Sequence, residues 1–232
     1  MKGAAAAAAL AAAALVACGG GVGSPANVDA AKVLSDGGAA MAQWKTATAT
    51  LKLTNGTVSL QGFTLVKAVT GVVLPTDSDT AYTVREQDIS ISFHVVITGG
   101  HLYLQIPLQG FHEATPAEAA VFPDMARLFN AQTGLPAVIP AGSNPRYVST
   151  DQVGGAAAYQ IATSYSADQI HGLLAQLNSN GPVAARIWAG VADHQIRKAT
   201  LSGTFGDGGK SAAVEIDITG FDQPVTITSP TP

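Results

Sequence analysis

Apolar and polar residues alternate with a period of two in several segments of this chain, and this pattern constrains the fold most. The stretch WKTATATLKL (44–53) sets Ala and Leu against Thr and Lys, and REQDISISFHVVI (85–97) alternates over a longer run. Successive side chains of a strand point to opposite faces, so such segments form strands with one buried face and one hydrated face. This arrangement is typical of antiparallel sheets.

Further strand-like segments follow at short intervals, and turn residues separate them. Asn55-Gly56 and Gly99-Gly100 predict hairpin turns, Gly154-Gly155 predicts another, and GDGG (206–209) predicts a fourth. The sequence therefore predicts about ten antiparallel strands in an α+β fold. The remaining predicted strands are 57–65, 101–106, 146–153, 156–165, 183–191, 194–205, 211–221 and 224–228.

Two helices are predicted as well, one before the first strand and one between the strands 156–165 and 183–191. Asn27 can cap a first helix, which Gly37-Gly38 should weaken or interrupt. Ser166 and Gln169 form a capping box that opens a later helix, and Asn180-Gly181 should end it. The apolar positions of the later helix are Ile170, Leu173, Leu174 and Leu177.

The segment 107–145 interrupts the alternation. It contains six of the twelve prolines but keeps many apolar residues. A loop of this length is uncommon in a compact domain unless it has a function. We expect a short helix over 124–132 and irregular chain around it, with the apolar residues covering part of the domain.

The amino terminus predicts export. Lys2 and the apolar run Ala4–Ala17 are typical of a signal peptide over residues 1–17. Leu15-Val16-Ala17-Cys18 resembles a bacterial lipobox, which implies that Cys18 carries a diacylglycerol and anchors the protein to the outer face of the cell membrane. Residues 18–27 would then be the acylated cysteine and a flexible tether. An ordinary signal peptide with an incidental cysteine is the alternative.

The composition excludes several other functions. A net charge of −4 without a basic cluster argues against nucleic-acid binding, and a single cysteine excludes a disulfide framework. The five histidines lack metal-ligand spacing, and there is no G-x-S-x-G motif. Asp77-Ser-Asp79, expected in a turn, lacks the further ligands that calcium needs. We predict no catalytic residue, no metal and no cofactor, and expect Trp44 and Trp188 to serve packing.

The order of several motifs resembles a known family. The chain carries GGHLYLQI, NAQTGLPAVI, SADQIHGLLAQL, RIWAG and PVTITSP in that order after the lipobox. Over residues 28–230 it resembles the LppX/LprA/LprF/LprG family of mycobacterial-type cell-envelope lipoproteins. The resemblance implies a LolA/LolB-like fold over residues 28–232, which is a strongly curved antiparallel half-barrel with helices on its concave face. It also implies an apolar cavity that binds acylated lipids or glycolipids and carries them across the envelope without catalysis.

The sequence suggests which side chains face this cavity. Small apolar residues on a wide curved sheet leave space that rings would otherwise fill. A shift of one residue in strand register would turn the predicted cavity residues of the sheet to its outer face. Replacing Val95 by Trp should block the cavity. The predicted cavity residues are Val58, Leu60, Ile89, Ile91, Phe93, Val95, Leu102, Leu104, Met125, Leu128, Phe129, Ile170, Leu173, Leu174 and Leu177.

Two other functions remain open at this stage. A surface lipoprotein with a packed core would dock envelope proteins or act with an envelope transporter, and it would carry no lipid. An envelope hydrolase would need polar side chains that converge in a cleft. A lipid carrier could also have a transporter as partner.

Overall fold

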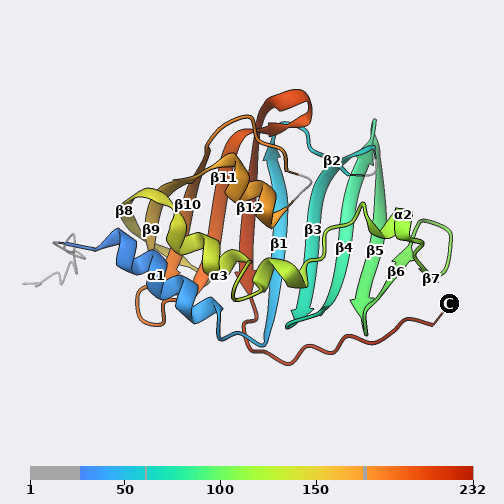
Figure 1. Ribbon diagram of the computed structural model, residues 1–232, viewed down its shortest axis with the longest axis horizontal. Helices are drawn as coiled ribbons and strands as arrows, with labels where there is room; N and C mark the ends of the chain where they lie inside the picture. The colour runs from blue at the N-terminus through green and yellow to red at the C-terminus, as the bar shows by residue number, and fades with distance from the viewer. Residues whose placement is uncertain (1–26, 61, 175–176, 232) are drawn as a thin grey trace, which may run out of the picture.

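A computed structural model describes residues 27–60, 62–174 and 177–231. In this part of the chain twelve strands form one antiparallel sheet, in the order β7-β6-β5-β4-β3-β1-β12-β11-β10-β9-β8, with β2 paired to β3 beside that path. Because β7 and β8 are its free edges, the sheet is curved but not closed (Figure 1). The predicted α+β class and antiparallel half-barrel are confirmed, with more strands than the ten expected.

The bounds of the elements are as follows. The strands are β1 (Thr46–Asn55), β2 (Ser59–Leu60), β3 (Phe63–Val73), β4 (Asp77–Glu86), β5 (Ile89–Thr98), β6 (His101–Gln105), β7 (His112–Glu113), β8 (Ser143–Val153), β9 (Ala156–Tyr165), β10 (Val183–Gly190), β11 (Ile196–Gly206) and β12 (Lys210–Thr219). The helices are α1 (Ala30–Met41), α2 (Pro116–Ala119), α3 (Leu135–Val138) and α4 (Ala167–Leu173), with 3-10 turns η1 (Ala126–Phe129), η2 (Ile139–Ala141) and η3 (Asp207–Gly209). None of these helices is long and apolar enough to cross a membrane.

Strand order explains why the Pro-rich segment covers the sheet. The chain finishes β7 at one edge and begins β8 at the opposite edge, so residues 114–142 must pass over a face of the whole sheet. Figure 1 shows this segment, with α2 and α3, in front of the strands. We call residues 114–142 the crossing segment. The predicted helix over 124–132 is only the single turn η1, and short turns are what a segment with this many prolines forms.

Helix α1 differs from its prediction at its start and in its middle. Asp29 caps it by accepting from the Lys32 amide at 3.0 Å, while Asn27 precedes the helix with a φ of +74°. Gly37 and Gly38 do not interrupt it, and both are buried. A Cβ at Gly38 would lie 2.6 Å from the Pro136 carbonyl oxygen. The missing side chain therefore lets α1 pack closely on α3. This contact offsets the lower helix propensity of glycine.

The strands between residues 55 and 86 were predicted incompletely. Asn55-Gly56 does not form a hairpin, because β1 pairs with β3 and the short β2 also pairs with β3. Strand β4 was missed, and Asp77-Ser-Asp79 lies in it rather than in a turn. A register shift between Leu65 and Lys67 in β3 changes the phase of the alternation there, which hides the pattern in the sequence.

Two predicted elements near the carboxyl terminus also differ. Helix α4 ends at Leu173, and Leu174 is already extended, so Leu177 follows the helix. Residues 224–228 form no strand. Instead, the segment after β12 runs past the ends of the strands (Figure 1), and Asp222 accepts from the Lys45 amide at 2.7 Å. Hydrogen bonds such as this one, rather than strand pairing, therefore hold the segment after β12 against the sheet.

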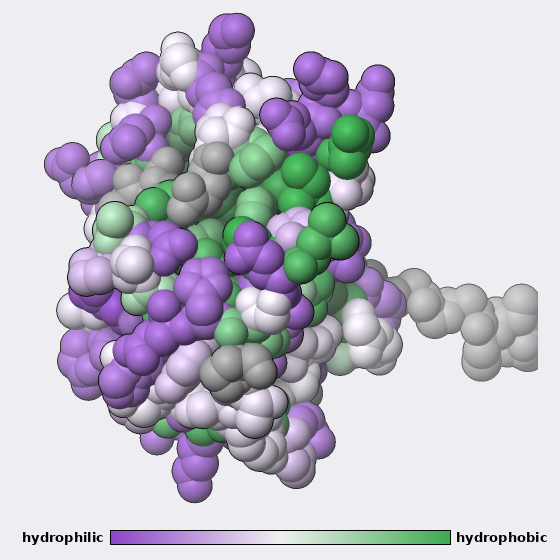
Figure 2. Space-filling view, turned by 90° about the vertical axis from the view of Figure 1, so that its right-hand side faces the viewer, coloured by the Kyte–Doolittle hydropathy of each residue, from purple (hydrophilic) through white to green (hydrophobic). Residues whose placement is uncertain are grey.

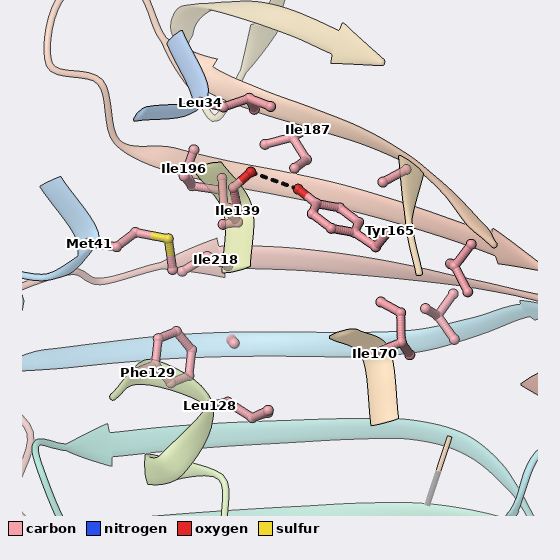
Figure 3. Packing of buried hydrophobic residues seen from close by; sticks show 14 of the residues in the cluster. Leu34, Met41, Leu128, Phe129, Ile139, Tyr165, Ile170, Ile187, Ile196 and Ile218 are labelled. Carbon is pink, nitrogen blue, oxygen red and sulfur yellow. Dashed lines mark hydrogen bonds between the residues drawn. The ribbon is translucent and has the colours of Figure 1, made fainter. Parts of the chain in front are cut away.

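The concave face carries two hydrophobic clusters. The larger cluster lies on β1 and β8–β12 under α1, η1 and η2, and Figure 3 shows Leu34 and Met41 of α1 beside Ile187, Ile196 and Ile218 of the sheet. The smaller cluster lies on β3–β6.

Both tryptophans serve packing as expected. Trp44 stacks on Phe221 with ring centroids 5.2 Å apart, and the Trp188 indole donates to Asp151 at 2.7 Å.

Candidate functional site

Two small apolar pockets lie between the concave face of the sheet and its cover, near the junction of the two clusters. Their volumes are about 60 and about 50 Å³. The first is lined by Leu51, Val58, Ser59, Leu60, Leu65, Ala68, Tyr82, Pro123, Met125, Leu174, Leu177 and Val214. The second is lined by Ala49, Leu51, Ala68, Thr70, Met125, Leu128, Phe129, Leu135, Ile170, Leu173, Leu174, Leu177, Leu201 and Ile216. The two pockets adjoin, because they share Leu51, Ala68, Met125, Leu174 and Leu177, and none of the described residues that line them is charged.

The floor of this region is made of small residues on neighbouring strands. Leu51 of β1 lies opposite Ala68 of β3, and Ala49 lies opposite Thr70. Two alanines at the middle of a wide sheet leave volume that larger side chains would occupy. The Thr70 and Thr80 hydroxyls are buried but bond each other at 2.8 Å. The floor is therefore apolar in effect, which suits a hydrocarbon chain.

The roof is formed by the crossing segment and α4. Met125 precedes η1 and contributes to both pockets, and the capping box of Ser166 and Gln169 begins α4 as predicted, directly after β9. Gln169 also donates to the Ala141 carbonyl at 3.1 Å, which ties α4 to the end of the crossing segment. Figure 3 shows Leu128, Phe129 and Ile170 pointing toward the sheet. The roof consists of short turns and the seven-residue helix α4 rather than one long helix.

The predicted cavity residues fall into two groups. Those in or next to β2, in the crossing segment, and in or directly after α4 line the pockets. They are Val58, Leu60, Met125, Leu128, Phe129, Ile170, Leu173, Leu174 and Leu177. Those from β5 and β6 do not line either pocket. Phe93, Val95 and Leu104 are buried in the smaller cluster, and Ile91 and Leu102 pack against it.

Aromatic side chains explain why the β5–β6 group lies away from the pockets. Phe122 of the crossing segment packs on Tyr82 and Phe93, with ring centroids 5.7 and 6.3 Å away. These rings fill the space that the prediction left empty, so a Trp at Val95 would overpack a closed core. Ile89 is not in the interior at all. It is 67% exposed, because it lies at the tip of the β4–β5 hairpin beyond the cover.

The prediction missed pocket residues on β1, β3, β4, β11 and β12. The alternation of 47–53 already placed Ala49 and Leu51 on a buried face, and Leu201 and Ile216 alternate similarly. The pattern does not give the strand order. In the sheet β1 lies between β3 and β12. Ala68 was hidden because the shifted register of β3 was not recognised.

The larger hollows of the surface are polar. One of about 360 Å³ is lined by Arg146, Arg186 and several hydroxyl side chains of β8–β11, and one of about 440 Å³ is lined by Asp124, Arg127 and His171 on the outside of the cover. Neither suits a hydrocarbon ligand. Figure 2 views the β6–β7 end of the molecule and shows apolar surface in its upper part, surrounded by hydrophilic side chains. Within residues 27–60, 62–174 and 177–231 no group of three acidic, His or Cys side chains could hold a metal ion.

The fold and site define a class of protein: one curved antiparallel sheet that keeps an apolar space under a crossing segment. A model of the LppX_LprAFG lipoprotein family matches residues 29–227, and the chain belongs to this family. The solved structure of LprF from Mycobacterium bovis has a TM-score of 0.70 at 16% identity and covers 88% of this chain and 97% of LprF. LppX from Mycobacterium tuberculosis has a TM-score of 0.61 at 12% identity and covers 85% of this chain and 97% of LppX.

The curated relatives that the chain matches carry a functional name. The lipoarabinomannan carrier protein LprG of Mycobacterium leprae is 23% identical over 149 residues, and its counterpart in Mycobacterium tuberculosis H37Rv is 26% identical over 149 residues. Each match covers 64% of this chain and 59% of the relative. The similarity therefore spans little more than half the length of these carrier proteins.

Proposed function

We propose that this chain binds acylated lipids or glycolipids between the concave face of its sheet and the roof formed by the crossing segment and α4, and carries them across the cell envelope. The observation that carries the proposal is the pair of adjoining apolar pockets at the junction of the two clusters, whose described lining residues are all uncharged. Membership of the lipoprotein family and relatives named lipoarabinomannan carriers support it.

Binding requires the roof to move. Ligand pockets usually measure roughly 300–1,000 Å³, well above the 60 and 50 Å³ of the two pockets. Short turns such as η1 and α3 can be displaced without breaking a long helix, whereas the sheet floor is held by ladders on both sides. An acyl chain would enter by separating Met125 and Leu174 from the floor. A polar head group would stay in water.

The attachment to the membrane is part of the same proposal. Cys18, the signal peptide over 1–17 and most of the tether over 18–27 lie outside the described residues. We propose that lipid on Cys18 holds the domain at the outer face of the cell membrane, where a transporter could load it. A Cys18→Ser variant should leave the membrane fraction of the native host; if it stays there in full, Cys18 is not the anchor.

A substitution at the floor tests the proposed site. Ala68 lines both pockets, so Ala68→Phe should fill them and lower the lipid content of protein purified without detergent by about tenfold or more. Ala81→Phe is the matched control, because Ala81 lies on the neighbouring strand and is exposed on the opposite face. Lipid is measured by mass spectrometry of a solvent extract.

Either of two results would contradict the proposal. Ala68→Phe protein that still carries lipid at the unmodified protein's ratio would show that lipid binds elsewhere. An extract of the unmodified protein from its native host without lipid would favour a packed-core module that docks envelope proteins.

A further inference from the structure

One buried polar group in the site has no partner. Tyr82 of β4 lines the first pocket, and its side chain is 3% exposed. Its hydroxyl is fully buried and makes no hydrogen bond within the part of the chain that the structure describes. The other buried hydroxyls nearby are satisfied, since Thr70 and Thr80 bond each other at 2.8 Å.

A native protein rarely leaves such a group alone. A buried donor without a partner is destabilising, and each case in a native structure calls for an explanation. Water does not provide one readily, because a buried water needs two to four polar partners. The other hydroxyl of this pocket, Ser59, already donates to Asp207 at 2.8 Å. Among the described residues of this wall, Tyr82 therefore carries the single unsatisfied polar side-chain group.

The ring of Tyr82 is held in place, so its hydroxyl is presented rather than free to turn away. Phe122 packs on it with ring centroids 5.7 Å apart, and Ala68 and Phe93 flank it on the neighbouring strands. A group held this firmly loses little entropy when a ligand binds to it. Its position suits a contact that orients a ligand.

The surroundings define the acceptor that fits. Burial, and secondarily the negative charge of Asp124, raise the pKa of the Tyr82 hydroxyl, so it stays protonated and donates. The lining residues include no cation, and the Asp124 charge opposes a carboxylate or phosphate at this point. A neutral carbonyl oxygen remains, and an ester places one directly at the end of an acyl chain.

We propose that Tyr82 donates a hydrogen bond to the ester carbonyl of a bound acyl lipid, so that the site selects ester-linked chains over ether-linked chains and free fatty acids. This inference rests on the proposed function and names the ligand chemistry of the same site. The apolar walls hold the chain, and Tyr82 fixes how deeply its ester end lies.

The test compares three lipids and two Tyr→Phe variants of the domain. The probes are dipalmitoylglycerol, its dihexadecyl diether analogue and palmitate, each offered in vesicles, with equilibrium binding measured without detergent. The unmodified protein should bind the diester about five to ten times more tightly than the diether. Tyr82→Phe should bind both equally, at the level of the diether.

Tyr165→Phe is the matched control, because Tyr165 is 4% exposed and donates to the Ile139 carbonyl at 3.0 Å (Figure 3). It should lower the melting temperature but keep the diester preference, whereas Tyr82→Phe should melt at the same temperature or higher. If Tyr82→Phe keeps the preference, or if the unmodified protein binds diether or palmitate as tightly as diester, this inference is wrong while lipid binding stands. Binding of none of the three probes would overturn the proposed function together with it.

Discussion

The two halves of the sheet bury the same kind of strand face under different covers. On β8–β12 the cover is α1, a continuous helix of three turns that approaches α3 through its glycines. On β3–β6 the cover is part of the crossing segment, which consists of single turns and depends on Phe122 to fill space. Between these halves, where neither cover is complete, the apolar pockets lie over Ala49 and Ala68.

This difference shows that the cover, more than the strands, decides where space remains. Apart from β4, which buries Ser78, Thr80 and Tyr82, the strands that flank the pockets bury mainly Ala, Val and Ile on the concave face. A whole helix fits its ridges closely against such a surface. Turns that prolines keep short cannot do so along their whole length, and the gap falls at the junction of the two clusters.

The largest expected difference between the packed half and the pocket region is the loss of stability when a large apolar side chain is shortened to alanine. Ile187 is 2% exposed under α1, so Ile187→Ala should lower the free energy of unfolding by about 2–5 kcal/mol. Leu174 is half-buried beside existing space, so Leu174→Ala should cost less than about 1.5 kcal/mol. Urea unfolding measures both. Equal losses would show that the region around Leu174 is packed as tightly as the α1 half.

A smaller effect is expected from filling the helix contact. Gly38→Ala places a Cβ 2.6 Å from Pro136 O and Pro140 Cγ, so it should destabilise the protein by about 1–2 kcal/mol despite alanine's better helix propensity. Gly172→Ala in α4 meets nothing within 4 Å and should stabilise by about 0.5–1 kcal/mol. Thermal unfolding would distinguish them. A gain in stability at both sites would mean that α1 does not pack closely.

The smallest effect concerns acid at the opposite end of the cover. The Thr115 amide and hydroxyl donate to Glu118 at 2.9 and 2.8 Å, and these bonds, with lesser help from His112, lower the pKa of Glu118 below its ordinary value of 4.5. Because the pKa of Glu118 is lower in the folded than in the unfolded protein, the ionised carboxylate stabilises the fold at pH values above the unfolded-state pKa. This contribution is lost as the pH falls through the folded-state pKa. Helix α2 should therefore fray below pH 4.5. The measurement is amide hydrogen exchange at residues 115–119, which should become faster after correction for intrinsic rates.

Glu118→Gln provides the control for this acid effect. Gln can complete the same capping box but does not titrate, so exchange at α2 should no longer depend on pH in this range. If the variant frays with acid as the unmodified protein does, another group controls α2. Helix α1 should stay protected throughout, because it is buried against the larger cluster.

The sequence was most informative where a pattern is local. The capping box at Ser166 and the alternation of 44–53 each correspond to an element of the structure, since caps and strand faces depend on neighbours in the chain. It was least informative at Ala68 and Ile89. The first is hidden by the register shift of β3, and the second obeys the alternation but lies beyond the cover.

By itself the sequence determined the antiparallel class, the family and the apolar nature of one sheet face, because period-two patterning and short motifs are written residue by residue. Only the tertiary structure decided which side chains surround the pockets. Strand order places Ala49 and Ala68 at the middle of the sheet, and the crossing from β7 to β8 brings Met125 over them. It also decided that Tyr82 is left without a partner, since a buried hydroxyl is satisfied or orphaned by groups distant in the chain.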